Sequence, residues 1–111
     1  MEKSQLMKGI LEGCILKIIE KQETYGYGIV EQLQQYGFGD VKEGTLYPLL
    51  LRLEKKELIK ATFKPSPLGP KRKYYQLTAD GKTYLDAFEH DWKTTVESVE
   101  RIFKEEEDES I

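Results

Sequence analysis

The sequence predicts a mainly α-helical fold with one small β-hairpin, and three observations support this. Apolar residues recur at intervals of three and four over several segments, which is the spacing of helices with one buried face. A proline- and glycine-rich stretch, residues 65–70, separates two short segments of strand character, as in a hairpin. A regular apolar stripe over the last third of the chain predicts one long helix.

Size and composition limit the possible architectures. The chain has 111 residues, of which 39% are hydrophobic and 33% charged, so we expect one domain whose modest core is completed by pairing with a second copy. No apolar run approaches the roughly 20 residues of a membrane span, and the N-terminus lacks a signal pattern. The lone Cys14 excludes an internal disulfide framework and a multi-cysteine zinc site. We therefore expect a cytoplasmic protein.

Two helices are expected in the first third of the chain. The first covers about residues 4–21. Gly9 and Gly13 within it reduce helix propensity by about 1 kcal/mol each, and they either admit another helix closely or are inert. The second helix covers about residues 25–36, with Thr24 as its N-cap.

A third helix is expected from Glu43 or Gly44 to Lys56. Pro48 is tolerated near a first turn but not in a helix interior, so the helix begins no earlier than about Glu43. Thr45 and Tyr47 then lie in or beside its exposed first turn. The predicted buried stripe consists of Leu46, Leu49, Leu50 and Leu53.

A hairpin and a long helix complete the expected order. Residues 58–63 and 71–77 form the two strands, and Thr78 caps a helix over residues 79–104. The acidic residues 105–111 are expected to be a disordered tail. Three helices, a hairpin and a long helix are the layout of a winged helix-turn-helix over residues 1–78 with an added dimerisation helix. The apolar seam of that helix is Leu85, Phe88, Trp92, Val96 or Thr95, Val99, and Ile102 or Phe103.

Charge is distributed unevenly along the chain. The net charge is −3, which by itself disfavours a nucleic-acid partner. Residues 52–73, however, carry eight basic and two acidic side chains, a local charge of +6, whereas residues 105–109 are all acidic. Because a phosphate backbone responds to the local field, the basic segment predicts a DNA-binding face.

Six short motifs, in this order, resemble the PadR family of bacterial transcription regulators. They extend over most of the chain, from about residue 6 to residue 92. Each motif is weak alone, but the order and spacing of all six are specific. They are Tyr25–Ile29, Gly44–Pro48, Arg52–Lys55, Leu58–Ile59, Gly69–Tyr75, and Leu77–Thr78 with Gly81.

The resemblance implies a homodimer that binds a two-fold-related operator and represses transcription. The short chain is similar to a small subgroup that includes regulators of multidrug transport, which hold flat aromatic compounds between paired tryptophans at the dimer interface. Trp92 stands at the matching place. Two positions depart from the family pattern: Leu51 replaces a common basic residue on the DNA-facing side of the third helix, and Glu57 replaces a common glycine after it.

The expected DNA contacts come from the recognition helix and the wing. A recognition helix places a few side chains on base edges, while backbone contacts set its register. Each of these DNA contacts has an alternative. Tyr47 could instead pack within the fold, and Arg52 could form a surface ion pair with a nearby acid. The basic residues of the wing could belong to a loop that only aids solubility. Tyr25 and Lys8 are weaker candidates for phosphate contact. The full predicted set is Thr45, Tyr47, Arg52, Lys71, Arg72, Lys73, Tyr25 and Lys8.

An effector site is the second expectation. A tryptophan on a symmetric seam has its mate across the two-fold axis, and a splayed pair would form a slot for a planar aromatic molecule. The alternative is that Trp92 only packs in the dimer core. The segment around Trp92 does not predict a preference for cationic ligands. The predicted lining is Trp92, Phe88, Val96, Met7, Leu11 and Cys14.

Other classes of function have less support. A helical dimer that binds another protein, without ligand sensing, is the main alternative. We expect no enzyme, cofactor or metal site, because the sequence lacks a nucleophile with a base, a phosphate-binding loop and a metal-ligand spacing. The one histidine, His90, and the one cysteine, Cys14, make no convincing metal set, and Cys14 is expected to be an inert buried thiol.

Overall fold

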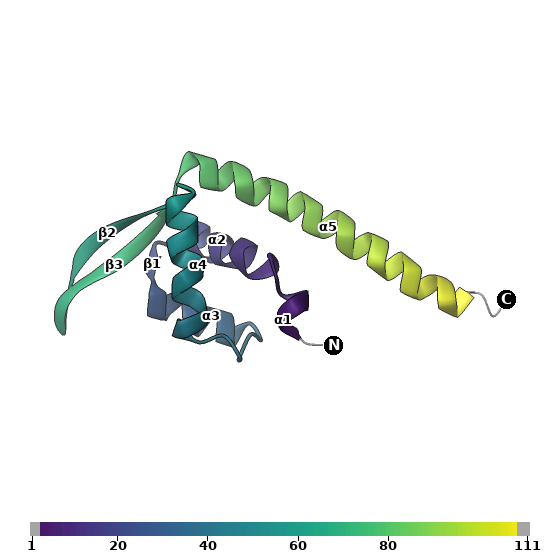
Figure 1. Ribbon diagram of the computed structural model, residues 1–111, viewed down its shortest axis with the longest axis horizontal. Helices are drawn as coiled ribbons and strands as arrows, with labels where there is room; N and C mark the ends of the chain where they lie inside the picture. The colour runs from purple at the N-terminus through teal and green to yellow at the C-terminus, as the bar shows by residue number, and fades with distance from the viewer. Residues whose placement is uncertain (1–2, 109–111) are drawn as a thin grey trace.

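The computed structural model describes residues 3–108 of the chain and the side chains of residues 5–104. A helical body carries a β-hairpin wing, and a long C-terminal helix begins beside the base of the wing and extends past the body in the opposite direction (Figure 1). The predicted fold class, mainly helical with a wing and a long C-terminal helix, is confirmed. The elements are α1 (Lys3–Leu6), α2 (Ile10–Lys21), β1 (Thr24–Tyr25), α3 (Gly26–Gln35), α4 (Glu43–Lys55), β2 (Ile59–Ser66), β3 (Gly69–Leu77) and α5 (Ala79–Asp108).

The first predicted helix is broken into α1 and α2 by Gly9. This residue has a φ of 83°, in the left-handed region where glycine carries no penalty from a Cβ atom. Gly13, in contrast, lies under α5, where a Cβ atom would be 2.2 Å from the Phe88 ring. Of the two glycines, only Gly13 provides the close approach that the sequence suggested.

The N-terminal cap expected at Thr24 is wrong. Thr24 is buried in β1 and pairs with Tyr75 of β3, and the residue that caps α3 is Tyr25, without a side-chain hydrogen bond. The sheet therefore has three strands in the order β1-β3-β2. A strand of two residues is too short to show the alternating pattern that identifies strands in a sequence.

The wing is longer than its strand pattern indicated. β2 runs through Pro65 to Ser66, and Ser66 pairs with Gly69 across the turn. The ladder is irregular between Lys64 and Ser66, where Pro65 has no amide hydrogen to donate. The proline-rich stretch is thus mostly strand.

Helix α4 begins at Glu43, as expected, but Pro48 lies within it and not in its first turn. As the sixth residue of the helix, Pro48 cannot donate to the carbonyl of Gly44. Gly44 is exposed, so water can satisfy that carbonyl. The hydrogen bond that Pro48 cannot form is therefore missing on the exposed side of the helix, and the buried Leu46, Leu50 and Leu53 keep their register.

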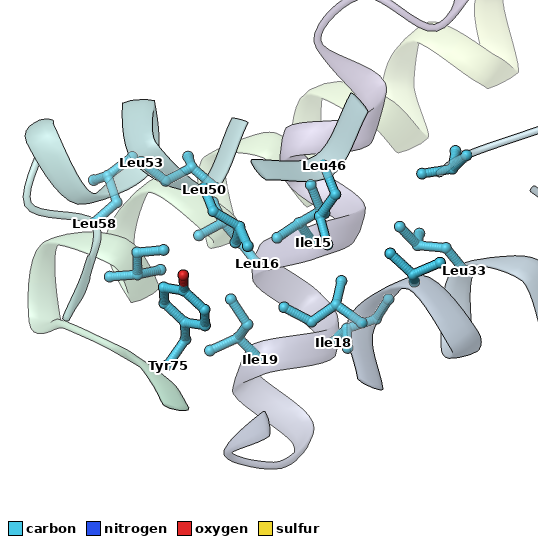
Figure 2. Close-up of a cluster of buried hydrophobic side chains, with 14 of the residues drawn as sticks. Ile15, Leu16, Ile18, Ile19, Leu33, Leu46, Leu50, Leu53, Leu58 and Tyr75 are labelled. Atoms are coloured by element: carbon cyan, nitrogen blue, oxygen red, sulfur yellow. The ribbon is translucent and has the colours of Figure 1, made fainter. Parts of the chain in front are cut away.

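The core gathers around α2, whose buried isoleucines and Leu16 point toward side chains of α3, α4 and β3 (Figure 2). Seven side chains in it are less than 2% exposed: Ile15, Leu16, Ile29, Leu33, Leu46, Leu50 and Leu53. Tyr75 of β3 closes the core on the side of the wing. Within residues 3–108, no helix combines the length and the apolar character that crossing a membrane requires.

Helix α5 begins at Ala79, where the Thr78 hydroxyl accepts the amide of Gly81 at 2.9 Å, so the predicted N-cap is confirmed. The helix runs to Asp108, beyond the expected end at Lys104. The expected disordered tail began at residue 105, but residues 105–108 are helical; residues 109–111 lie outside the described part of the chain. Thirty residues make α5 about 45 Å long, and the chain measures 65 × 28 × 20 Å.

Glu57 ends α4 in a conformation that suits glycine better. Its φ is 59°, its amide donates to the carbonyl of Glu54 at 2.9 Å, and the amide of Leu58 donates to the carbonyl of Leu53 at 3.0 Å. This is the Schellman pattern, in which the residue after the cap is usually glycine. The departure at position 57 therefore changes the residue but keeps the geometry.

Replacing Glu57 by glycine should stabilise the fold by about 1 kcal/mol, since a left-handed conformation costs a side-chain-bearing residue about 1–2 kcal/mol. Urea unfolding at a fixed protein concentration would measure this. Lys56, one residue earlier, has a right-handed φ of −78°, so Lys56→Gly should destabilise the fold. Equal effects of the two substitutions would contradict the assignment of strain to Glu57.

Candidate nucleic-acid interface

The wing and α4 enclose an open groove of about 440 Å³, here called the wing groove. Four of its eight lining residues are tyrosines, and two are basic residues of β3. Its position follows from the sheet, because β1 brings Tyr25 beside β3 and α3 begins one residue later. The lining residues are Tyr25, Gly26, Tyr27, Tyr47, Leu51, Arg72, Lys73 and Tyr75.

Glycines explain how the aromatic wall fits together. A Cβ atom on Gly26 would lie 2.8 Å from the ring and hydroxyl of Tyr47, and one on Gly28 would lie 2.5 Å from the Thr24 hydroxyl. The Tyr25–Ile29 motif thus lets α3 pass close beneath α4 and β1. Tyr47 packs against this helix start and remains 44% exposed, so packing and surface contact are compatible for this residue.

Arg72 is held above the tyrosines of the groove. Its guanidinium lies 4.6 Å from the centre of the Tyr25 ring, and Tyr25 meets Tyr74 edge-on at 5.4 Å between ring centres. A cation over an aromatic face is attracted by about 0.5–1 kcal/mol when exposed. This stack presents a positive charge at the surface with its orientation already set.

Two predicted DNA-binding side chains have acidic partners in the structure. Arg52 forms an ion pair with Glu12 of α2, whose side chain is 9% exposed. Lys73 donates to Glu54 of α4 at 2.7 Å, and this hydrogen bond raises the pKa of Lys73. The ion pair that sequence analysis offered as the alternative for Arg52 is therefore present. Both pairs tie α4 to its neighbours and reduce the net charge near the groove.

The acidic partners and Tyr75 were missed by sequence reasoning, and Tyr27 was left out of the predicted DNA contacts. Glu12 is a lone acid on an otherwise apolar helix face, which is a recognisable signal because buried carboxylates need partners. Glu54 is an ordinary helix acid, and nothing in the sequence connects it to Lys73. Tyr27 and Tyr75 enter the groove only through the pairing of β1 with β3.

The remaining predicted DNA-binding residues are surface side chains. Thr45 lies exposed in the first turn of α4, and Lys71 lies exposed on β3. Lys8 is also exposed, but it follows α1, which lies at the end of the body away from the wing (Figure 1). The structure thus gathers Tyr25, Tyr47, Arg72 and Lys73 at one groove and leaves Lys8 apart from it.

The predicted effector residues come mainly from α2 and α5, which pack against each other; Met7 lies just before α2. Phe88 packs over Gly13 and, with Leu11 and Cys14, against the edge of the core. Met7 and Val96 are half-buried, and Trp92 is 45% exposed. Burial raises the pKa of the Cys14 thiol, which lowers its reactivity at neutral pH. Within the described residues, no cluster of three or more acidic, histidine or cysteine side chains could hold a metal ion.

The seam of α5 changes its surroundings along the helix. Leu85 is 3% exposed against the body, whereas Val99, Ile102 and Phe103 are 45%, 66% and 67% exposed. One apolar stripe therefore begins in the core of this chain and continues on a helix that extends past it (Figure 1). Its outer part leaves a large apolar surface on a single chain, which soluble monomers rarely do.

Comparison with known proteins agrees with this geometry. The model of the "Transcriptional regulator PadR-like family" matches residues 15–87. A relative from Lysinibacillus sphaericus, described as an uncharacterized protein, is 36% identical over 102 residues, which are 90% of this chain and 94% of the relative.

Solved structures give the same result. The crystal structure of a PadR-like transcriptional regulator from Bacillus cereus is 47% identical to the chain with a TM-score of 0.83, over 89% of this chain and 96% of that one. A Streptococcus transcriptional regulator is 44% identical with a TM-score of 0.82, over 88% and 96%. Bacillus subtilis PadR in complex with operator DNA is 29% identical with a TM-score of 0.64, over 76% of this chain and 45% of that one.

Proposed function

Because this chain belongs to the PadR-like family of transcriptional regulators, we propose that it binds operator DNA through α4 and the wing and represses transcription. A homodimer would present two such faces to a two-fold-related operator. Membership of a family of regulators also agrees with the expectation that the chain is not an enzyme. The observation that carries the proposal is the wing groove, where Arg72 and the tyrosines stand beside the exposed side of α4.

Charge supports a nucleic acid as the partner of this face. Lys55, Lys56 and Lys71 are exposed on α4, just after it and on β3, outside the two ion pairs described above. Tyrosine hydroxyls and basic side chains are common donors to phosphate oxygens. The stacked Arg72 would meet a phosphate with little loss of side-chain entropy, because its orientation is already restricted.

Operator binding measured against salt concentration tests the proposal. Each phosphate that a basic side chain neutralises adds about 0.9 to the slope of log affinity against log salt. Lys71→Ala should lower that slope by about one phosphate per site and weaken binding to all duplexes alike. Lys93→Ala, which removes the same charge from α5, is the matched control and should leave the slope unchanged. A flat salt response of the unmodified chain would contradict DNA binding.

A planar aromatic ligand at the dimer interface would relieve repression in this proposal. Support comes from Trp92, which is half-exposed on α5, the helix that packs against α2, with the half-buried Val96 one helical turn further along. In a dimer formed through α5, the partner's tryptophan would approach from across the axis, and the pair would offer two faces for stacking. Binding there would alter the spacing of the two helices, and so of the two wings.

Titration with planar aromatic compounds should quench or shift the fluorescence of Trp92, the only tryptophan in the chain. By calorimetry, Trp92→Ala should bind the same compound roughly tenfold more weakly, since an aromatic pair contributes about 0.5–1.5 kcal/mol beyond area burial. The compound should also lower operator affinity. Equal binding by Trp92→Ala would restrict Trp92 to packing in the dimer core.

A further inference from the structure

One apolar side chain occupies the middle of the exposed face of α4. Leu51 is 53% exposed, and it lies on the side of the helix opposite Leu46, Leu50 and Leu53, which are at most 1% exposed. Tyr47 and Lys55 stand one helical turn before and after it. Leu51 is not part of the core of this chain, so its side chain is free to contact whatever approaches the helix from outside.

The surroundings of Leu51 combine an apolar floor with basic side chains. Leu51 lines the wing groove together with Tyr27 and Tyr47, and Arg72 and Lys73 lie on the same groove. Lys55 and Lys56 are exposed at the end of the helix. An apolar protein surface would suit Leu51 but not these cations. A DNA duplex suits both, because its phosphates are anionic and one of its four bases carries an apolar group.

That apolar group is the C5-methyl of thymine, which is displayed in the major groove. A leucine side chain has no hydrogen-bond donor or acceptor, so it cannot recognise the edges of guanine, cytosine or adenine by polar contacts. It can discriminate only by covering a methyl group or by excluding water from one. Where the family commonly carries a basic side chain, Leu51 therefore offers the DNA an apolar surface.

We propose that Leu51 is a specificity-determining residue that contacts a thymine methyl group in each operator half-site. The inference rests on the proposed function and deepens it, because it names the base feature that the middle of α4 recognises. Thr45 and Tyr47 at the helix start and Lys71 on the wing would set the register by backbone contacts. Leu51 then supplies selectivity that depends on a methyl group and not on charge.

Replacing thymine by uracil removes that methyl group and leaves base pairing intact. A duplex is first selected by the full-length chain from a random-sequence pool, and each thymine is then replaced in turn. At one thymine in each half-site, the substitution should lower affinity about fourfold, which corresponds to about 0.8 kcal/mol for one buried carbon group. Leu51→Ala should bind the thymine duplex more weakly and should show no further loss with uracil.

Leu68→Ala is the matched control, because Leu68 is 90% exposed at the tip of the wing. This variant should keep the full uracil effect. Circular dichroism checks that Leu51→Ala remains folded, which its exposure predicts. Overturning results would be no thymine at which uracil lowers affinity, or an equal uracil effect in Leu51→Ala. Failure to enrich any duplex would instead overturn the proposed function, and this inference with it.

Discussion

Replacing Gly81 by alanine is expected to destabilise the fold by about 3 kcal/mol, at the upper end of typical overpacking costs. A Cβ atom at this position would lie 2.0 Å from the carbonyl oxygen of Leu58. That oxygen belongs to the backbone and already accepts the amide of Thr78 at 3.1 Å, so no side-chain rotation can relieve the clash. The start of α5 would have to move away from the base of the wing.

The consequences reach α4, because the same joint links the two helices. The Thr78 hydroxyl donates to the carbonyl of Glu57 at 2.7 Å, directly after the end of α4, and accepts the amide of Gly81. A shift of α5 therefore removes the cap of one helix and a hydrogen bond at the exit of the other. We expect weaker operator binding as well as lower stability.

Urea unfolding at fixed protein concentration would measure the stability change. Gly44→Ala is the matched control: Gly44 is also helical, but a Cβ atom there would meet nothing within 4 Å. That substitution should leave stability unchanged or raise it by up to about 1 kcal/mol. A loss below about 1 kcal/mol for Gly81→Ala would show that the joint tolerates displacement.

Val99→Asp is expected to convert a dimer into monomers and to weaken binding to a two-half-site operator by at least about 100-fold. Linked binding of two modules raises overall affinity by factors of about 10² to 10⁴, and a monomer forfeits this gain. Val99 is 45% exposed in the single chain, so the charge should not disturb the fold of the monomer. The charge destabilises the dimer only if a second α5 covers the seam, because the carboxylate would then be buried without a partner.

Thr94→Asp adds the same charge on the opposite side of α5, where Thr94 is exposed, and should preserve both the dimer and operator affinity. Analytical ultracentrifugation would report the mass of each variant, and titration of the operator would report its affinity. If Val99→Asp sediments and binds like the unmodified chain, the exposed seam is not the dimer interface. Monomers that retain full affinity would show that pairing is unnecessary for binding.

Sequence patterns are sufficient to locate the longer helices and strands but not the shortest elements. α4 and α5 were located because their apolar periodicity extends over many residues, and the two wing strands because a proline- and glycine-rich turn separates two segments of strand character. β1 and the break at Gly9 were not, since each depends on one or two residues. Thr24 illustrates the difficulty: a threonine before a helix is a common cap, but here strand pairing with Tyr75 is the interaction that forms.

The candidate interface was anticipated in outline more than in detail. The basic segment and the motifs identified the wing and α4, and Tyr25, Tyr47, Arg72 and Lys73 do line one groove. The ion pairs of Arg52 with Glu12 and of Lys73 with Glu54 join residues 40 and 19 positions apart. Patterns of local spacing carry no information about such pairs.

The sequence by itself determined the helical body, the wing, the long helix and the family, because periodicity, turn residues and ordered motifs are local properties of the chain. Only the tertiary structure decided which basic side chains are neutralised, which tyrosines meet, and that Leu51 lines the same groove as Arg72 and Lys73. These outcomes depend on contacts between segments far apart in the chain. Two such contacts, of Gly13 with Phe88 and of Gly81 with Leu58, then fix where α5 leaves the body.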